Sequence, residues 1–416
     1  MTPTPEQAVS AHFQMTCPDG PGRIAVAVSG GGDSLALLCL MRDRFADVVA
    51  LTVDHGLRPE AAEEARTVGD IAATLNVPHD VLRWRWDGAG NLSEEARKGR
   101  YAALAAWCVA NDVAHCATGH TRDDNVESFF LGLMRGAGLD GLCGMRPTFE
   151  TDGVTFHRPL LEISRDALRT ELRTRGIAWI EDPTNDNTAY DRARIRKALA
   201  TLDLPDDQIA RSVANLAATR RDLGFELERR LSGSWRLDGP DLVVETTCWD
   251  GLTAEFRRRT LTAAIRFLTG TQHAPRSASL MRLVQADWSA LPGPATLQGC
   301  TFAMDPGGLR IGRELAAVSD PVPSREKWDN RWTAEGPHGD DATIRATGEA
   351  GLLQLDPAWK DGTIPRRSML AAPSLWRGDR LTACPFADPA DSGARESWRW
   401  SPQDDSNRFI ASIRSA

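Results

Sequence analysis

One glycine-rich segment, residues 29–34 (SGGGDS), constrains the fold of this chain more than any other. The apolar run before it, residues 24–28, predicts a buried strand, and the apolar run after it, residues 35–41, predicts a helix. Glycines lack the Cβ atoms that keep a backbone away from an anion, and they allow positive φ angles. The backbone N–H groups at a helix start then face the anion. The segment therefore predicts a phosphate-binding loop between a strand and a helix.

The residues beside the glycines bear on two interpretations of this segment. A glycine run between a strand and a helix is often only a tight turn. Here Ser29 and Ser34 supply hydroxyls for phosphate oxygens, and the carboxylate of Asp33 among phosphates requires a divalent cation. The segment lacks the Gly-Lys-Ser/Thr ending of a Walker A loop. We therefore predict a different phosphate loop, with Mg²⁺ held at Asp33.

Length and composition indicate a soluble protein of about two or three domains. The 416 residues are 42% hydrophobic and 25% charged, which is ordinary for globular proteins. No apolar stretch approaches the roughly 20 residues of a membrane span. Residues 1–14 lack the basic and then apolar segments of a secretory signal. We therefore expect a cytoplasmic protein.

The cysteines and the net charge exclude some classes of function. The eight cysteines are scattered without a Cys-x-x-Cys pair, which argues against a structural zinc site or an iron–sulfur cluster. We expect reduced, mostly buried thiols. The net charge of −8 is unusual for a protein that binds nucleic acid, but local clusters of Lys and Arg decide such binding.

A second buried strand, residues 47–53, ends in Asp54 and His55. Polar residues at the carboxyl end of a parallel strand are where open α/β sheets bind ligands. The same residues are also ordinary turn formers. A helix over 60–75 and a strand over 79–84 are expected to follow.

A basic cluster follows on the next predicted helix, which Ser93 is suited to cap. Arg97 and Arg100 are three residues apart, so they share one face of that helix, with Lys98 beside them. This face can reach phosphates. It can equally be a solvated, salt-bridged surface.

A third set of polar residues follows the predicted strand 113–118. His120, Asp124 and Glu127 are spaced i, i+4 and i+7, which puts them on one face near the start of a helix capped by Thr121 or Asp123. An imidazole and two carboxylates together suit metal binding or proton transfer. Acidic residues in a first turn are also ordinary complements of the helix dipole. The spacing alone leaves both interpretations open.

The alternation of strands and helices up to about residue 200 predicts an α/β fold with a doubly wound, mostly parallel sheet. Beyond it we expect a mainly helical second domain over 201–316, beginning with a long helix over 208–231. Residues 317–340 are expected to form a linker. Residues 341–416 are expected to form a small β-rich piece or a loose tail.

Several motifs occur in the order that is typical of one enzyme family, and they cover about half the chain. They are residues 29–34, 53–58, 96–101, 118–127, 133–139, 158–161 and 182–185. Together they resemble tRNA(Ile)-lysidine synthetase, a family of the N-type ATP pyrophosphatases in the PP-loop superfamily. The resemblance implies an adenine-nucleotide α-hydrolase-like fold. It also implies that the second domain, 201–316, contacts tRNA, and it offers a degenerate tRNA-binding domain as one interpretation of residues 341–416. It also implies ATP, Mg²⁺, free L-lysine and the isoleucine tRNA with a CAU anticodon as ligands and partners, with a homodimer as a further possibility.

The resemblance implies that lysine is ligated to C2 of the wobble cytidine through an adenylated intermediate, giving lysidine, AMP and pyrophosphate. It assigns nucleotide binding to Ser29, Gly30, Gly31, Gly32, Asp33, Ser34, Asp54 and His55, and magnesium binding to Asp33. It assigns catalytic roles to Asp33, Arg97, His120, Asp124, Glu127 and Arg192. Arg100 and Arg196 match further positions expected to meet phosphates of ATP or of the anticodon loop.

The chain departs from the family pattern at a few positions. Asn125 stands where Gln is usual, Ser128 where Thr is usual, and Ala193 where an Asn usually follows the first Arg of the basic helix over 190–197. A tRNA-thiolation enzyme of the same fold is the nearest alternative, but such enzymes carry Cys-x-x-Cys pairs. A non-catalytic nucleotide-binding module is another, and it has no need for Asp33, Asp124 and Glu127 around a phosphate loop.

Overall fold

The computed structural model divides the chain into two compact units, Met1–Arg220 (unit 1) and Arg221–Ala416 (unit 2). It describes residues 3–56, 61–86, 88, 90, 92–181, 191–202, 204–271, 275–288, 290–391, 397–401 and 406–415. Within these residues, no helix combines the length and the apolar character needed to cross a bilayer. All eight cysteines are free thiols, as expected.

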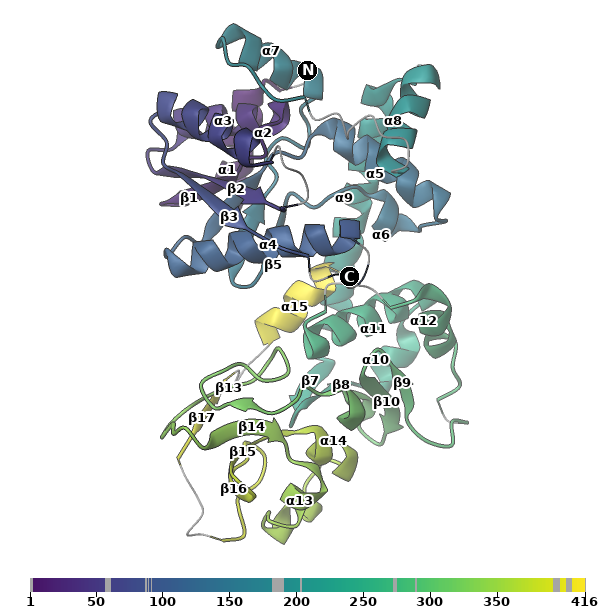
Figure 1. Cartoon of the computed structure of the whole chain (residues 1–416). Coiled ribbons are helices and arrows are strands. Elements are labelled where there is room, and N and C mark those ends of the chain that lie inside the picture. Colours follow the sequence, from purple (N-terminus) through teal and green to yellow (C-terminus); the bar gives the residue numbers. More distant parts are fainter. Residues whose placement is uncertain are drawn as a thin grey trace. The chain divides into compact units, whose positions relative to one another are not determined.

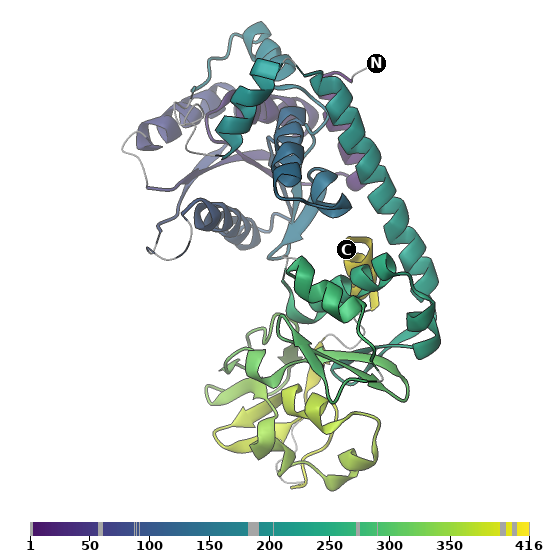
Figure 2. The same cartoon turned by 90° about the vertical axis from the view of Figure 1, so that its right-hand side faces the viewer.

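Unit 1 alternates strands with helices, as the sequence predicts (Figure 1). Its strands are β1 (Ile24–Ala27), β2 (Val48–Asp54), β3 (His79–Arg83), β4 (His115–Thr118), β5 (Thr148–Thr151) and β6 (Val154–His157). Its helices are α1 (Pro5–Thr16), α2 (Gly32–Arg44), α3 (Ala61–Thr74), α4 (Leu92–Ala110), α5 (Arg122–Met134), α6 (Leu139–Leu142), α7 (Arg165–Thr174) and α8 (Asp191–Leu202). The long helix α9 (Asp206–Leu231) begins in unit 1 and ends in unit 2 (Figure 2).

The six strands form one sheet in the order β3-β2-β1-β4-β6-β5. All neighbouring pairs are parallel except β5 and β6, which confirms the doubly wound, mostly parallel sheet. Side chains alternate between the faces, so Ile24 and Val26 pack with α1, α2, α3 and α7, while Ala25 packs with α4. Figure 1 shows these helices on the two sides of the sheet.

Unit 2 corrects the expectation of a helical second domain. Its first part is a five-stranded sheet in the order β7-β8-β11-β10-β9, and every described pair in it is antiparallel. The strands are β7 (Trp235–Asp238), β8 (Asp241–Val244), β9 (Ala295–Leu297), β10 (Cys300–Asp305) and β11 (Gly308–Arg313), packed with helices α10 (Thr246–Gly251), α11 (Ala254–Thr269) and α12 (Ser277–Val284). These strands are three to six residues long and carry charged residues, so their period of two is weak in the sequence.

The segment expected to be a linker, residues 317–340, contains two short strands and buried side chains. The strands are β12 (Val322–Pro323) and β13 (Thr333–Glu335), and Trp328 and Trp332 lie in a hydrophobic core. A four-stranded sheet, β12-β14-β15-β16, and a pair, β13-β17, follow, with β14 (Ala342–Ala346), β15 (Pro373–Arg377), β16 (Arg380–Ala383) and β17 (Arg399–Ser401). Helices α13 (Gly348–Leu352) and α14 (Arg366–Ala371) pack beside them, and α15 (Ser406–Ser415) packs on α11.

Candidate active site

The glycine loop is held in shape by its own serines. The Ser34 hydroxyl accepts a hydrogen bond from the Ser29 backbone N–H at 3.1 Å and donates one to the Gly31 carbonyl at 2.9 Å. Gly30 has φ +86°, and a Cβ there would lie 2.8 Å from the Ile180 side chain. The chain therefore requires glycine at this position, and α2 starts directly after the turn, at Gly32.

Three strand ends meet at the same edge of the sheet as this loop. The parallel register pairs Ala27 with Leu51 and with Thr118, so the residues that follow β1, β2 and β4 come together. A Cβ on Gly119 would lie 3.0 Å from Ser34 Cα, which shows how closely the end of β4 approaches α2. The glycine loop, Asp54 and His120 thus belong to one edge of the sheet.

A cluster of carboxylates lies beside the loop, around the side chain of Arg165 at the start of α7. Arg165 Nε lies 3.2 Å from Asp33 Oδ2, and its terminal nitrogens lie 3.2 Å from Asp124 Oδ1 and 3.4 Å from Glu127 Oε1. Arg196 Nε from α8 contacts the same Glu127 oxygen at 2.8 Å. The structure therefore brings together the three acids that the sequence singled out, and it adds an arginine between them.

The surroundings of these acids act on their pKa values in opposite directions. Burial raises the pKa of Asp33 to about 6, although the Arg165 charge opposes this shift. Burial also disfavours the charged form of Asp124, but the Arg165 charge and the hydrogen bonds from Thr121 outweigh it and leave the Asp124 pKa below its usual range. At neutral pH both groups are anionic, and Asp33 is the one closer to taking up a proton.

A basic and aromatic cluster surrounds Tyr101 of α4. The guanidinium groups of Arg97 and Arg100 lie 5.4 and 5.0 Å from the Tyr101 ring centre. Arg158 lies 4.2 Å from the Phe149 ring centre and donates to the Arg146 carbonyl at 2.9 Å. Burial lowers the pKa values of Arg97 and Arg158. Arg158 is buried, and its guanidinium near those of Arg97 and Arg100 gains from an anionic ligand.

His120 lies at the end of β4, two residues before α5, so it is not on the helix face with Asp124 and Glu127 that its spacing predicted. Its Nδ1 lies 3.1 Å from the Thr118 hydroxyl. Burial and then the Arg158 charge lower the His120 pKa to about 3, and the Asp124 charge acts in the opposite direction. His120 is therefore a neutral imidazole at pH 7, within electrostatic range of both charged clusters.

The nucleotide-binding residues predicted after β2 lie partly exposed. Asp54 Oδ1 accepts a hydrogen bond from the Gly56 backbone at 2.8 Å, as in a turn. The His55 ring packs edge-on against Trp84, and burial lowers the pKa of His55. The Arg100 charge lowers it further. Arg192 on α8 is exposed, and its charge contributes to lowering the pKa of Arg97.

Four buried polar atoms of this region have no hydrogen-bond partner. Among the described residues of unit 1 they are the only such atoms: His55 Nδ1, Arg100 Nε, Glu127 Oε2 and Arg158 Nε. Buried polar groups are normally paired, so a set of unpaired ones at one sheet edge calls for a polar ligand. The guanidinium N–H groups suit phosphate oxygens, and the carboxylate oxygen suits a cation.

The comparisons with known proteins point to the same chemistry. Residues 4–202 match the PP-loop domain family. A tRNA(Ile)-lysidine synthase of Ruegeria pomeroyi is 38% identical over 95% of this chain and 94% of its own length. The chain belongs to the tRNA(Ile)-lysidine synthase family. A synthase of Hyphomonas neptunium is 38% identical over 69% of this chain and 78% of its own length. One of a Bradyrhizobium species is 38% identical over 74% of this chain and 92% of its own length.

Some of the synthase motifs lie outside the described residues, namely 57–60 and the Asp-Pro-Thr-Asn turn at 182–185. Sequence reasoning missed Arg165, the first residue of α7. Its only signal is an arginine in a first turn, where acids are usual. Ala193, the departure from the family pattern, is buried on α8, and α8 packs on α5.

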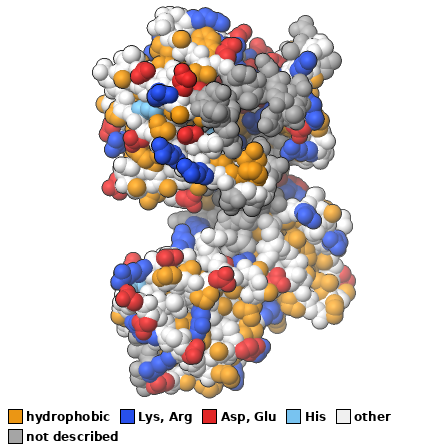
Figure 3. All heavy atoms as spheres, viewed as in Figure 1, with side chains coloured by type: hydrophobic (Ala, Val, Ile, Leu, Met, Phe, Trp, Pro, Cys, Tyr) orange, Lys and Arg blue, Asp and Glu red, His pale blue; other side chains and the backbone are white. Residues whose placement is uncertain are grey.

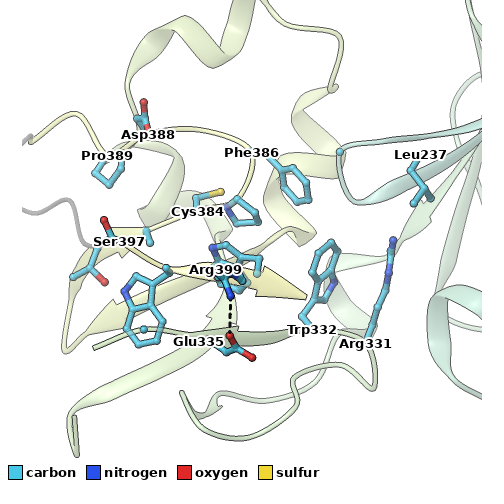
Figure 4. A pocket seen from close by; sticks show the side chains of 17 residues that line it. Leu237, Arg331, Trp332, Glu335, Cys384, Phe386, Asp388, Pro389, Ser397 and Arg399 are labelled. Atoms are coloured by element: carbon cyan, nitrogen blue, oxygen red, sulfur yellow. Dashed lines mark ion pairs between the residues drawn. The ribbon is translucent and has the colours of Figure 1, made fainter. Parts of the chain in front are cut away.

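Unit 2 contains a separate cavity of about 1000 Å³. Figure 4 shows Trp332 and Phe386 beside one another in it, and Glu335 facing Arg399 at 3.7 Å. Trp398 also lines this cavity. The PP-loop match at residues 4–202 lies in unit 1, so this cavity is outside the ATP-binding domain.

Proposed function

We propose that this chain is an ATP-dependent tRNA(Ile)-lysidine synthase that joins free L-lysine to C2 of the wobble cytidine of the CAU-anticodon isoleucine tRNA. The C2 oxygen attacks the α-phosphate of ATP, and pyrophosphate leaves. The ε-amino group of lysine then attacks C2, and AMP leaves with that oxygen. The product base pairs with A instead of G, which changes codon reading from AUG to AUA and charging from methionine to isoleucine.

The observation that carries this proposal is the gathering of Asp33, Asp124 and Glu127 beside the glycine loop. The cytosine oxygen is a poor leaving group until it becomes a phosphate ester, so the reaction needs a nucleotide site next to the lysine site. The ε-amino group of lysine is protonated at pH 7, so it needs a carboxylate that binds the ammonium and helps to remove a proton. Asp124 and Glu127 supply these carboxylates in the proposal.

The phosphates of ATP and of the anticodon loop are assigned to the glycine loop and the basic cluster. Residues 29–34 would hold the pyrophosphate through backbone N–H groups and hydroxyls. The unpaired Nε atoms of Arg100 and Arg158 support phosphate binding beside Arg97, and Arg192 and Arg196 extend this surface along α8. A single-stranded loop gives up a base to such a pocket at modest cost.

Mg²⁺ fits the donor set in chemical type. Asp33 and Glu127 offer the carboxylate oxygens that Mg²⁺ prefers, and Glu127 Oε2 is buried without a partner. The described residues contain no group of three or more His, Cys, Asp or Glu side chains placed to hold a metal ion. In this cluster the carboxylates contact Arg165. When bound between Asp33 and the phosphates, the ion would neutralise the charge that develops on pyrophosphate.

The remaining parts of the proposal concern the partner and the place of the reaction. Lys and Arg side chains are interspersed with Asp and Glu over the face seen in Figure 3, so we assign tRNA binding to local clusters. We also propose that residues 201–316 contact the tRNA and that residues 341–416 are a degenerate tRNA-binding domain. The proposed location is the cytoplasm. The proposed assembly is a homodimer, which sedimentation of the purified protein would test.

Incubation with radiolabelled lysine, ATP and transcripts of the isoleucine and methionine tRNAs tests the function. We expect label on the isoleucine tRNA alone, together with AMP and pyrophosphate. Asp33→Asn should abolish labelling, whereas Asp43→Asn, at the other end of α2, should not. Absence of label with the wild-type protein, or equal labelling by Asp33→Asn, would contradict the proposal.

A further inference from the structure

The contacts of Arg165 with the carboxylate cluster are all long. Its three ion-pair distances are 3.2, 3.2 and 3.4 Å. Charge-assisted N–H···O bonds are normally about 2.7–2.9 Å. The neighbouring pair of Arg196 and Glu127 reaches 2.8 Å in the same cluster. One guanidinium is therefore shared between three acids, and each of its contacts is longer than this range.

The backbone of Arg165 is held much more firmly than its side chain. Its N–H donates to Asp123 Oδ2 at 2.9 Å, and the Ser164 side chain caps the helix that Arg165 begins. The side chain remains 19% exposed, so it borders solvent on one side. The side chain can leave the carboxylates while α7 stays in place.

The cluster also has a buried acceptor atom that Arg165 does not contact. Glu127 is 2% exposed, and its Oε2 has no partner among the described residues, while its Oε1 contacts both Arg165 and Arg196. If Arg165 withdrew, Arg196 would still pair with Glu127. Asp33 and Asp124 would then lose a charge partner, which makes the site attractive to an incoming cation.

We propose that Arg165 is a positioning residue that serves as a removable counter-ion. Its guanidinium holds Asp33, Asp124 and Glu127 together in the free protein, and it gives up carboxylate oxygens to a cation that arrives with the substrates. The carboxylates would accept either an ammonium group or a divalent metal ion. The ammonium would be that of the substrate lysine, which rests on the proposed function, and the metal ion would be the one that accompanies ATP.

This proposal predicts that removing the guanidinium tightens cation binding, whereas a purely structural role predicts that it weakens binding. If Arg165 competes with the cation for the carboxylates, the apparent affinity for the cation is the intrinsic affinity multiplied by the fraction of protein in which Arg165 has left them. If Arg165 occupies the cluster most of the time, Arg165→Gln should bind the competing cation about five times more tightly. The KM for lysine should fall while kcat stays equal or decreases.

Two titrations of the full chain separate the sources of the cation. Mn²⁺, which prefers the same oxygen ligands as Mg²⁺, is followed by the electron paramagnetic resonance signal of the free ion, and L-lysine is followed by calorimetry. Tighter binding of lysine alone assigns the cluster to the ammonium, and tighter binding of Mn²⁺ alone assigns it to the metal. Both outcomes support the proposal. Arg169→Gln, one turn along α7, is the matched control and should change neither titration.

Weaker or unchanged binding of both cations by a folded Arg165→Gln protein would overturn the proposal. Circular dichroism establishes whether that variant folds. If it does not fold, Arg165→Lys takes its place, because a single ammonium cannot contact three carboxylates in the geometry of the guanidinium. Arg165→Lys should also bind more tightly than the wild type, and equal or weaker binding would overturn the proposal. Neither titration uses tRNA, so a failure of the proposed lysidine synthesis can be distinguished from a failure of the proposed role of Arg165.

Discussion

Asp124 Oδ2 accepts two hydrogen bonds from Thr121, one from the backbone N–H at 2.8 Å and one from the hydroxyl at 2.9 Å. Thr121 is the N-cap of α5, and the pair forms a capping box in which Asp124 takes the acidic position. The other oxygen of Asp124 contacts Arg165. One carboxylate therefore both starts the helix and belongs to the candidate active site.

We predict that Asp124→Asn separates these two roles. The amide oxygen can still accept from the Thr121 backbone, so the free energy of unfolding should fall by about 1 kcal/mol or less. Loss of the negative charge should reduce lysine transfer to tRNA by about 100-fold or more. Thr121→Ala is the converse, since it should destabilise the protein with a smaller effect on kcat. Urea unfolding and initial rates measure both, and equal activity of Asp124→Asn and wild type would refute the catalytic role.

A second prediction compares neighbouring glycines of the phosphate loop. Gly30→Ala should lower the free energy of unfolding by about 1–3 kcal/mol, because φ is +86° and the new Cβ would meet Ile180 at 2.8 Å. At Gly31 the nearest atom to an added Cβ is 3.7 Å away and φ is −70°. Gly31→Ala should therefore fold as the wild type does, and any loss of ATP affinity in it, measured by calorimetry, reports on the ligand. Equal thermal stability of the two variants would contradict this reasoning.

A third prediction concerns a row of three histidines, of which His12 and His157 are buried and His115 is half-buried. His157 bonds through Nδ1 to His12 Nε2 and through Nε2 to His115 Nδ1, both at 3.0 Å. Burial lowers the pKa of His12 to about 4 and that of His157 to about 3, and it also lowers the pKa of His115. All three imidazoles are therefore neutral at pH 7.

The sign of the pH dependence follows from these shifts. The unfolded chain binds protons near pH 6.5, but the folded histidines do not until about pH 4 or 3. Their contribution is fully present above pH 6.5 and is lost as the pH falls below it, by about 1 kcal/mol per pH unit for each histidine. Urea unfolding between pH 7 and 5 measures this slope, and His12→Gln should reduce it. A slope that His12→Gln leaves unchanged would exclude His12 as a source.

The catalytic half of the fold could be predicted because its signals are local. A buried strand, a glycine turn and a helix occupy 18 consecutive residues, from Ile24 to Met41, and the structure keeps them in that order. Thr121 was one of two expected caps for α5, and the capping box with Asp124 selects it. The parallel order of β1, β2 and β4 then brings the polar strand ends together.

The parts that could not be predicted depend on contacts between distant residues. Arg165 is 132 residues from Asp33 in the chain, and nothing local marks it as the partner of three acids. The sheet of unit 2 is formed by strands as short as Ala295–Leu297, and its central strands β8 and β11 pair across a long separation, Val244 with Leu309. In such strands tertiary packing overrides local propensity, which is why helices were expected there.

The last prediction tests a buried ionic cluster of unit 2 that has no part in the proposed chemistry. Arg310 is 5% exposed, lies 2.8 Å from Asp305 and 3.2 Å from Asp241, and also pairs with Asp238. Asp241 is 1% exposed, and burial raises its pKa to about 6. Removing Arg310 would leave Asp241 buried without this counter-charge, while Asp305 would keep its pair with Arg367 at 2.7 Å.

Arg310→Met should therefore lower the free energy of unfolding by about 3–5 kcal/mol. Arg366→Met, which breaks the exposed pair of Arg366 with Glu349, should cost about 1 kcal/mol or less. Adding Asp241→Asn to Arg310→Met should restore part of the loss, since it removes one of the uncompensated charges. Urea unfolding of the single and double variants measures these differences. Similar losses for Arg310→Met and Arg366→Met would mean that solvent reaches the Arg310 cluster, because only an exposed pair is that weak.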